Sequence, residues 1–400
     1  MHSAEQERPE SDRPAPATHT GGNPGSEWTC LLECARPVAD PQRRKERWAA
    51  SLNGRLLCEL AEEHGVLGLA ARVLLDAGQV ELSQQAAETL RSWRRSHAFF
   101  VLHLTAEMLR LFDAFQRLRI EALVTKGPAL SVRCYGDAGV RQYGDLDLVV
   151  REKDILRVTE LMLGLGYEGT VPLSAIRAGK IPGEYNFQRK GSPVLVEFHT
   201  ERTFRYHPRP LPIENLFRRQ ARVILDGHEV PVLSPEDELI LVCIHGAKHF
   251  WERLGYIADV AGLVVRQKLD WAQVQSAAAE VNAERMLHVA VRLAHETLEA
   301  SPPEEVLRRV EAEAAARKLT AQILRRLPAA GAAAPGIFGR AMFRARMRGG
   351  GLAGLRYLLR LSFSPTEEDW GLGTMDHRPR MLDVLGRPIR LARKYGSGKS

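Results

Sequence analysis

The chain has few cysteines and no long apolar run. Its 400 residues include five cysteines, and none of them forms a CxxC pair or a zinc-ligand spacing. A zinc finger and a disulfide-stapled scaffold are therefore not expected, and an odd cysteine count without a signal peptide predicts a reduced, cytoplasmic setting. No segment approaches about 18 consecutive apolar residues and the N-terminus lacks an apolar signal core, so export and membrane spanning are not expected.

Lysine is also scarce, at 10 of the 56 basic residues, so the net charge of +7 comes mainly from arginine. A basic chain suggests a nucleic-acid or phosphate-bearing partner. Residues 337–400 hold 13 basic and 5 acidic residues, a net of +8 against the +7 of the whole chain, so the first 336 residues carry a net −1. The positive charge belongs to the C-terminal segment, and nucleic acid is an alternative partner rather than the favoured one.

Hydrophobic residues make up 44% of the chain and charged residues 26%, which is typical of a globular protein too long for one average domain. Shifts in composition and periodicity predict five segments: a flexible tail over 1–26, an N-terminal helical region over 27–118, an α/β core over 119–233, a helical domain over 234–330 and a basic C-terminal segment over 331–400. The expected fold class is α+β, with a small mixed-sheet core flanked by helical regions on both sides.

The core is expected to hold several short strands and one amphipathic helix. Stretches of period two predict strands at 121–125, 145–150, 185–189 and 193–200. The helix is expected over 154–163. Two serines have the position of helix N-caps: Ser83 precedes a long apolar-faced segment that reaches Phe115, and Ser234 precedes a proline and an acidic first turn.

Acidic side chains gather on the second and fourth of these strands. Strand geometry points Asp145 and Asp147 to the same face, where two carboxylates repel each other unless a cation lies between them. Oxygen-only ligands of this kind suit Mg²⁺, which takes further contacts from water and substrate phosphates. If the strand of Glu197 neighbours the strand of the two aspartates, three carboxylates converge on one metal site. The alternative is a solvated strand face.

A phosphate-binding turn is expected where the first strand ends, at Lys126-Gly127. Glycine lets the backbone approach a triphosphate, and the amides of the following turn can cradle it. An ordinary strand-end lysine is the alternative. Arg141 and Arg133 are candidates to neutralise the triphosphate, because a guanidinium group suits phosphate geometry.

Together these elements resemble the nucleotidyltransferase superfamily related to DNA polymerase β. The resemblance is carried by Lys126-Gly127, Asp145-x-Asp147, the helix ending at Leu165-Gly-Tyr167, and Val196-Glu-Phe-His199. More narrowly, the chain is similar to an uncharacterised bacterial nucleotidyltransferase family with KG, DxD and ExH elements, over roughly residues 50 to 395.

The resemblance implies a Mg²⁺-dependent transfer of a nucleoside monophosphate from a nucleoside triphosphate, with ATP the expected donor. The acceptor would be a small molecule, a peptide or a protein, and pyrophosphate would be released. Asp145, Asp147 and Glu197 would be the catalytic residues and would hold two Mg²⁺ ions. Glu197 stands where aspartate is commoner in the superfamily, and it would also deprotonate the acceptor hydroxyl.

One departure from the superfamily concerns the nucleotide contacts. The superfamily usually places Gly-Ser after the first strand, whereas this chain has Gly127-Pro128. Ser131, one turn further on, is expected to supply the missing hydroxyl, and Lys126, Gly127 and Arg141 complete the predicted nucleotide-binding set. The departure motivates an alternative function, in which the core is a degenerate nucleotidyltransferase that serves as a non-catalytic peptide- or RNA-binding module.

Three histidines near these elements each have two interpretations. His199 shares a strand face with Glu197 and is either a structural histidine or a catalytic one. His245 and His249 lie four residues apart and so share one helix face. They either line the acceptor side of the site or fill the interface between the helical domain and the core, and the interface is the favoured interpretation.

The C-terminal segment contains three arginines spaced by four residues, Arg340, Arg344 and Arg348. A helix would align them on one side, where they would either contact a polyanion or form a solvated face beside packed apolar residues. The sequence leaves the acceptor and the oligomeric state open.

Overall fold

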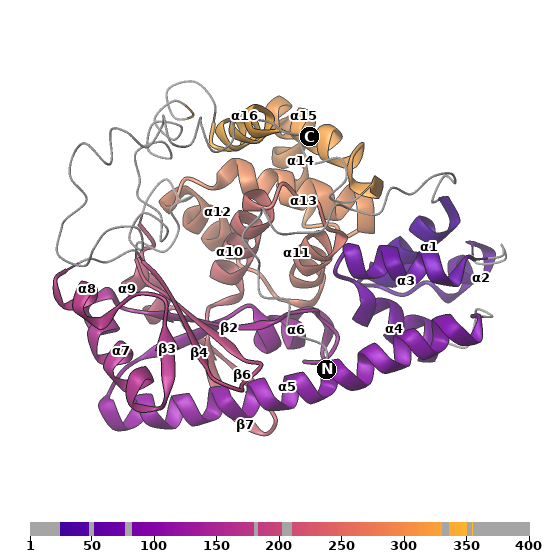
Figure 1. The fold of residues 1–400 in the computed structure, drawn as a ribbon. Coiled ribbons are helices and arrows are strands. Elements are labelled where there is room, and N and C mark those ends of the chain that lie inside the picture. The colour runs from indigo at the N-terminus through magenta and orange to yellow at the C-terminus, as the bar shows by residue number, and fades with distance from the viewer. Residues whose placement is uncertain are drawn as a thin grey trace.

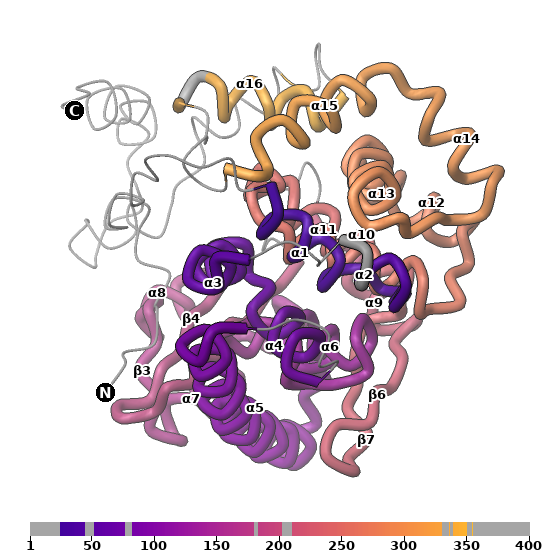
Figure 2. The backbone as a smooth tube through the Cα atoms, turned by 90° about the vertical axis from the view of Figure 1, so that its right-hand side faces the viewer, coloured from indigo at the N-terminus to yellow at the C-terminus, as the bar shows by residue number. Residues whose placement is uncertain are grey.

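The computed structural model describes residues 25–47, 52–76, 82–179, 183–201, 210–329, 336–349 and 354. Residues 1–24 of the expected flexible tail and most of the basic segment over 331–400 lie outside these residues, whereas residues 25 and 26, also assigned to the tail, are helical. Figures 1 and 2 show the described part as a sheet with helices on both of its faces. Among these residues, no helix combines the length and the apolar character needed to cross a membrane.

One seven-stranded sheet forms the centre of the described fold. Its strands are β1 (Ala122–Thr125), β2 (Asp145–Val150), β3 (Tyr167–Gly169), β4 (Glu184–Arg189), β5 (Leu195–His199), β6 (Ala221–Leu225) and β7 (His228–Val232). They lie in the order β3-β4-β5-β2-β1-β7-β6, with β2 parallel to β5 and antiparallel to β1. The predicted α+β class with a mixed sheet is confirmed.

All four strands predicted for the core are present, with ends that differ by no more than two residues. Strands β3, β6 and β7 were not predicted. The β6–β7 hairpin turns through Asp226 and Gly227, which have φ of 49° and 77°. Two left-handed residues suit the twist of a two-residue hairpin, and Asp-Gly is a sequence that favours such a turn.

Helices precede, interrupt and follow the sheet. The N-terminal ones are α1 (Gly25–Ala35), α2 (Pro41–Arg47), α3 (Gly54–Glu63), α4 (Leu67–Asp76) and the long α5 (Gln84–Leu118). Between strands lie α6 (Gly127–Tyr135), the 3-10 turn Glu152–Asp154, α7 (Ile155–Gly164), α8 (Leu173–Arg177) and α9 (Ile213–Arg218). The last group is α10 (Pro235–Lys248), α11 (Leu254–Arg266), α12 (Trp271–Glu280), α13 (Glu284–Leu298), α14 (Glu304–Ala312), α15 (Ala314–Leu324) and α16 (Ile337–Met347). Both predicted serine caps are confirmed: Ser83 accepts a hydrogen bond from the backbone amide of Ala86, and Ser234 accepts one from that of Asp237.

The two faces of the sheet bury different groups. Leu146 and Leu148 lie in an apolar core that includes α5 and α7, and Figure 1 shows α5 running along this side of the sheet. On the opposite face, Leu123 and Val149 belong to a second core that includes α10, α11 and α13. Because side chains alternate along β2, Asp145 and Asp147 lie on the second face, toward the C-terminal helices.

Candidate functional site

The predicted carboxylates lie on two adjacent parallel strands. Asp147 of β2 is in register with Glu197 of β5, and Asp145 is in register with Leu195 one pleat earlier. The expected adjacency of the two strands is confirmed. Asp147 is fully buried, whereas Asp145 and Glu197 are partly accessible. Together with Lys126 and His199, the three acids are called the carboxylate site below.

Lys126 places its ammonium group against Asp147. The Nζ atom lies 3.1 Å from Oδ1 and 3.0 Å from Oδ2 of Asp147, and both side chains are largely buried. Burial alone would lower the pKa of Lys126, but the charges of Asp147, Asp145 and Glu197 raise it above its usual value. Lys126 therefore remains charged and acts as a fixed cation among these acids.

His199 is the second partner of Asp147. Its Nε2 lies 2.7 Å from Asp147 Oδ1, and because a carboxylate oxygen accepts, this nitrogen donates the hydrogen bond. The same nitrogen lies 3.8 Å from Glu197 Oε2. Burial alone would raise the pKa of Asp147, but Lys126 and His199 hold it well below its usual range. His199 was predicted to be structural or catalytic, and it lies directly in the carboxylate site.

Glu197 is in a different electrostatic position. Burial, followed by the charges of Asp147, Asp145 and Glu184, raises the pKa of Glu197 well above its usual value. The carboxylate site therefore holds more acidic charge than its lysine neutralises. A divalent cation would supply the missing positive charge.

The donor atoms near Asp147 fit a metal ion. Asp147, Glu197 and His199 can each offer one ligand atom such that all three atoms lie within 4.8 Å of one another. Carboxylate oxygens suit Mg²⁺ or Mn²⁺, while an imidazole nitrogen is a more usual ligand of transition metals. Asp145 is not in this group, but its negative charge raises the pKa of both Lys126 and Glu197. The residues present are thus compatible with an oxygen-rich cation site.

The turn after β1 has an unusual backbone. Lys126 has φ of 54° and ψ of −142°, a conformation that residues with a side chain rarely adopt, and Gly127 follows with φ of 47°. Strained backbone of this kind persists where the surroundings hold it, and it is concentrated at functional sites. Here Glu238 of α10 holds the turn, because its Oε1 accepts hydrogen bonds from the Lys126 amide at 3.0 Å and from the Thr125 hydroxyl at 3.2 Å.

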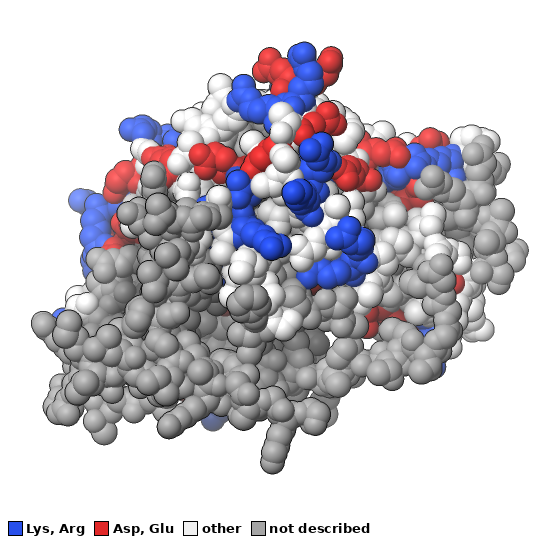
Figure 3. Space-filling view, turned by 90° about the horizontal axis from the view of Figure 1, so that it is seen from above, with Lys and Arg blue, Asp and Glu red and all other residues white. Residues whose placement is uncertain are grey.

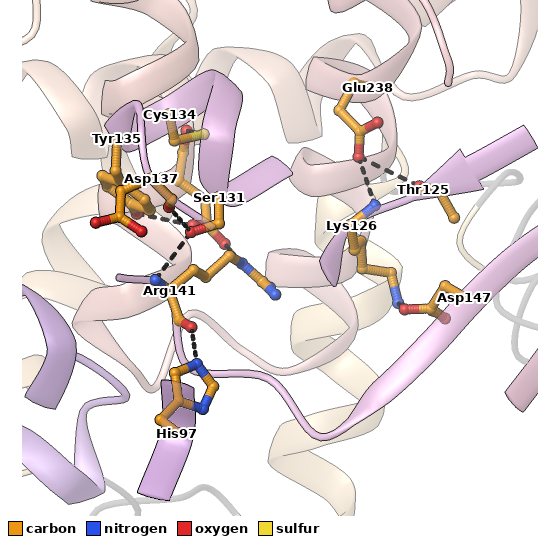
Figure 4. A network of polar contacts seen from close by, with 11 residues as sticks. His97, Thr125, Lys126, Ser131, Cys134, Tyr135, Asp137, Arg141, Asp147 and Glu238 are labelled. Atoms are coloured by element: carbon orange, nitrogen blue, oxygen red, sulfur yellow. Dashed lines mark hydrogen bonds and ion pairs between the residues drawn. The ribbon is translucent and has the colours of Figure 1, made fainter. Parts of the chain in front are cut away.

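Ser131 and Arg141 lie in a separate set of contacts, shown with the carboxylate-site turn in Figure 4. The Ser131 hydroxyl donates to the backbone oxygen of Asp137 at 2.6 Å and accepts from the Arg141 amide at 3.0 Å. Arg141 Nε donates to Asp259 of α11 at 2.9 Å, and Tyr135 donates to the other oxygen of Asp259 at 2.8 Å. His97 Nε2 donates to the backbone oxygen of Arg141. Ser131, Tyr135, Arg141, Asp259 and His97 are called the Arg141 network below.

The structure does not bring Ser131 together with the carboxylates. Its side chain is completely buried and its hydroxyl is engaged on both sides by the chain itself. Arg133, the other arginine considered, is also buried, and its Nη1 lies 3.9 Å from Glu238 Oε2. Lys126 and Gly127 are therefore the predicted nucleotide-binding residues that lie next to the acids.

His245 lies in α10 and His249 directly follows this helix, and the charge of Lys126 acts on both. Their ring centroids are 4.7 Å apart, and Tyr256 of α11 lies 5.3 Å from the first and 5.6 Å from the second. Burial lowers the pKa of both histidines well below the usual value, and the charge of Lys126 acts in the same direction. All three rings are partly accessible, so they form an uncharged aromatic group beside the carboxylate site.

The arginines of α16 turn toward α10. Arg340 and Arg344 lie over the ring of Phe250 at 5.4 and 4.7 Å, and Arg348 is buried. Arg344 also donates to the backbone oxygen of Lys248 at 3.3 Å. Figure 3, viewed from the side of α14 to α16, shows basic and acidic side chains intermixed rather than a field of one sign. Packing contacts therefore account for these arginines in the described residues.

Two residues of the site region were assigned no role of their own from the sequence. Glu238 holds the Lys126 turn, and Asp259 holds Arg141. Glu238 is one of three acids in the first turn of α10, where helix-dipole reasoning treats all three alike. Its hydrogen bonds with Thr125 and Lys126 distinguish Glu238 from its neighbours.

Comparisons with known proteins find a matching family and a distant structural neighbour. A family model described as an uncharacterised nucleotidyltransferase matches residues 51–299, a range that contains the carboxylate site and the Arg141 network. Among solved structures, an antigenic nucleotidyltransferase-like protein from Paracoccidioides brasiliensis is similar at 17% sequence identity with a TM-score of 0.30, over 50% of this chain and 94% of that chain. No curated protein matches the chain.

Proposed function

Because the chain belongs to the uncharacterised nucleotidyltransferase family, we propose that it is a Mg²⁺-dependent nucleotidyltransferase. It transfers a nucleoside monophosphate from a nucleoside triphosphate, with ATP as the expected donor, to a small-molecule, peptide or protein acceptor. Pyrophosphate is the second product. A bacterial origin and a cytoplasmic location belong to the same proposal, as do the five segments predicted for the chain.

The observation that carries the proposal is the register of Asp147 with Glu197 beside the Lys126 ammonium group. The site has surplus negative charge, because Asp147, Glu197 and Asp145 lie around the ammonium group of Lys126. Such a site is suited to bind divalent cations together with a polyphosphate, which supplies the remaining oxygen ligands.

In this proposal Asp145, Asp147 and Glu197 hold two Mg²⁺ ions. When bound, the ions neutralise the charge on the entering and leaving oxygens. An acceptor oxygen forms a bond to the α-phosphorus, and the bond from that phosphorus to the bridging oxygen of pyrophosphate breaks. Glu197 takes the proton of the acceptor hydroxyl.

Lys126 and Gly127 contact the phosphates in this proposal. The Lys126 ammonium group is fixed next to Asp147, so it can attract a phosphate oxygen without a large movement. Ser131 and Arg141 remain predicted nucleotide-binding residues, and a contact with nucleotide would require their present hydrogen bonds to be exchanged. His245, His249 and Tyr256 border the acceptor side.

Titration calorimetry with ATP and the other triphosphates in the presence of Mg²⁺ tests the proposal. The wild type should bind at least one of them, and a variant carrying Asp145→Ala and Asp147→Ala should not. A matched control is Asp237→Asn, which removes a buried carboxylate of α10 that pairs with Arg219. Equal binding by wild type and double variant, with no pyrophosphate released in an acceptor screen, would contradict the proposal.

The alternative function is a non-catalytic module that binds a peptide or RNA. It is supported by the inward-facing hydroxyl of Ser131 and by the direct contact of Lys126 with both oxygens of Asp147. Metal-dependent release of pyrophosphate that is abolished by Asp147→Asn would eliminate this alternative.

A further inference from the structure

Glu238 reaches from the helical domain into the turn that precedes α6. It lies in the first turn of α10 and its side chain is fully buried. One of its oxygens, Oε1, accepts two hydrogen bonds, from the Lys126 amide at 3.0 Å and from the Thr125 hydroxyl at 3.2 Å, and Figure 4 shows both. Burial of a carboxylate costs free energy unless hydrogen bonds or opposite charges compensate it. The compensating donors here include the Lys126 amide, which lies 112 residues away in sequence.

The partner is the strained backbone of Lys126. With Lys126 at φ of 54° and ψ of −142°, its amide donates to Glu238 of α10. The same conformation directs the side chain to the other side, where Nζ contacts Asp147. Without an acceptor for the amide, the residue would relax toward an ordinary conformation, because a buried N–H requires a partner. The position of the ammonium group therefore depends on the carboxylate that holds the amide.

We propose that Glu238 is a positioning residue of the transfer site, which fixes the Lys126-Gly127 turn and so sets where the Lys126 ammonium group meets the triphosphate. The inference rests on the proposed function for its nucleotide, but the positioning of the turn is a property of the protein alone. Arg133 accompanies Glu238, with Nη1 at 3.9 Å from Oε2, and adds positive charge on the side away from the turn. The helical domain thereby contributes a residue to the geometry of the core.

The neighbouring residue provides a matched control. Asp237 is also an acid in the first turn of α10, is also buried, and binds Arg219 and the Ser234 hydroxyl instead of the turn. If Glu238 only stabilises the fold, Asp237→Asn and Glu238→Gln should have comparable effects on every measurement. If Glu238 positions Lys126, the two variants should differ at the turn.

Hydrogen–deuterium exchange tests the positioning without any nucleotide. In the wild type and in Asp237→Asn, the backbone amide of Lys126 should exchange slowly. In Glu238→Ala it should exchange at least about 10-fold faster, and in Glu238→Gln, which keeps an acceptor oxygen, it should exchange at an intermediate rate. Acylation of Lys126 by an amine-reactive reagent should be slow in the wild type and in Asp237→Asn, faster in Glu238→Gln and fastest in Glu238→Ala. Unchanged exchange of this amide in both Glu238 variants would overturn the inference.

Titration calorimetry with Mg²⁺–ATP tests the consequence for the site. Glu238→Ala should weaken ATP binding by about 10-fold and Glu238→Gln by less, whereas Mn²⁺ alone should bind both variants as it binds wild type. Equal loss of ATP binding in Asp237→Asn would overturn the inference. If the wild type itself binds no triphosphate, the proposed function fails while the exchange measurement still decides the role of Glu238. Should Glu238→Ala not fold, Glu238→Gln carries both measurements.

Discussion

The carboxylate site and the Arg141 network each place a buried cation against a buried aspartate, but only one of them is balanced. In the carboxylate site, Lys126 Nζ lies 3.0 Å from Asp147 Oδ2. The negative charges of Asp145 and Glu197 also act on this ammonium group. Burial raises the pKa of Glu197, and the charges of Asp147 and Asp145, which Lys126 offsets only in part, raise it further. This region is built to accept more positive charge.

The Arg141 network is the opposite case. Arg141 is paired with Asp259, the other oxygen of Asp259 accepts from Tyr135, and the backbone of Arg141 is bound by Ser131 and His97. Its guanidinium and carboxylate groups balance one to one, and each oxygen of the Asp259 carboxylate accepts a hydrogen bond. Tyr135 of α6 and Asp259 of α11 belong to this charge-balanced network, so it fixes the position of α6 against α11. A buried pair of opposite charges therefore indicates a ligand site here where one sign is in excess.

Asp147→Asn should give the largest effect, in the carboxylate site. The change removes the carboxylate that contacts Lys126 and His199 and that offers a metal ligand. We expect transfer activity to fall by more than about 100-fold, because even residues outside the ligand shell cost 10–100-fold when lost. Pyrophosphate release measures this, with Asp237→Asn as control. Activity within a few-fold of wild type would show that this site is not the centre of transfer.

Asp259→Asn should act on stability instead. It leaves the buried Arg141 without its carboxylate, and breaking a buried pair in this way costs about 3 kcal/mol or more in free energy of unfolding. Urea titration measures the loss. Binding of Mn²⁺ alone should remain as in wild type, because Asp259 does not reach the carboxylate site. A variant as stable as wild type would show that the Arg141 network is not structural.

Local patterns in the sequence were sufficient to predict the carboxylate face. Period-two alternation separates Asp145 and Asp147 from Leu146 and Leu148, and this separation depends only on strand geometry. The four predicted strands and the cap at Ser234 likewise depend on neighbouring residues. Such features are decided within a few residues, so the chain itself contains the information.

Long-range partners could not be predicted in the same way. Glu238 and Asp259 contact residues that lie 112 and 118 positions away in sequence, and no spacing rule connects them. Ser131 illustrates the same limit, since its position one turn into α6 is compatible with a phosphate contact, but its hydroxyl turns to Asp137. The contacts of Glu238 with Lys126 and of Asp259 with Arg141 depend on how α10 and α11 pack on the sheet.

Glu197→Gln should separate stability from binding. The substitution keeps the size of the side chain and removes one of the repelling charges, so the metal-free protein should gain about 1 kcal/mol in free energy of unfolding. Binding of Mn²⁺ should weaken at the same time. Urea titration in the presence of a chelator measures the first effect, and calorimetry the second. A less stable metal-free variant would show that other groups of the protein already neutralise the charge of Glu197. The carboxylate site would then be balanced, as the Arg141 network is.

The smallest effect concerns the pH dependence of the Arg141 network. His97 Nε2 donates to the backbone oxygen of Arg141 at 2.8 Å, and burial lowers the pKa of His97 below its usual 6.5 despite this hydrogen bond. The unfolded chain therefore binds a proton more readily than the folded one, so the contribution of His97 to stability is present above pH 6.5 and is lost as the pH falls below it. For one group the slope is at most about 1.4 kcal/mol per pH unit.

His97→Gln isolates this contribution, since glutamine keeps an N–H donor and does not titrate. Other buried histidines also lose stability in acid, among them His64, whose pKa burial lowers to about 4, but they do so equally in both proteins. Urea titrations at about pH 7 and about pH 5.5 should therefore show a smaller loss in the variant than in wild type. An equal loss of stability in wild type and variant would mean that the folded protein binds the His97 proton as readily as the unfolded chain does. The Arg141 network would then accept extra positive charge, as the carboxylate site does.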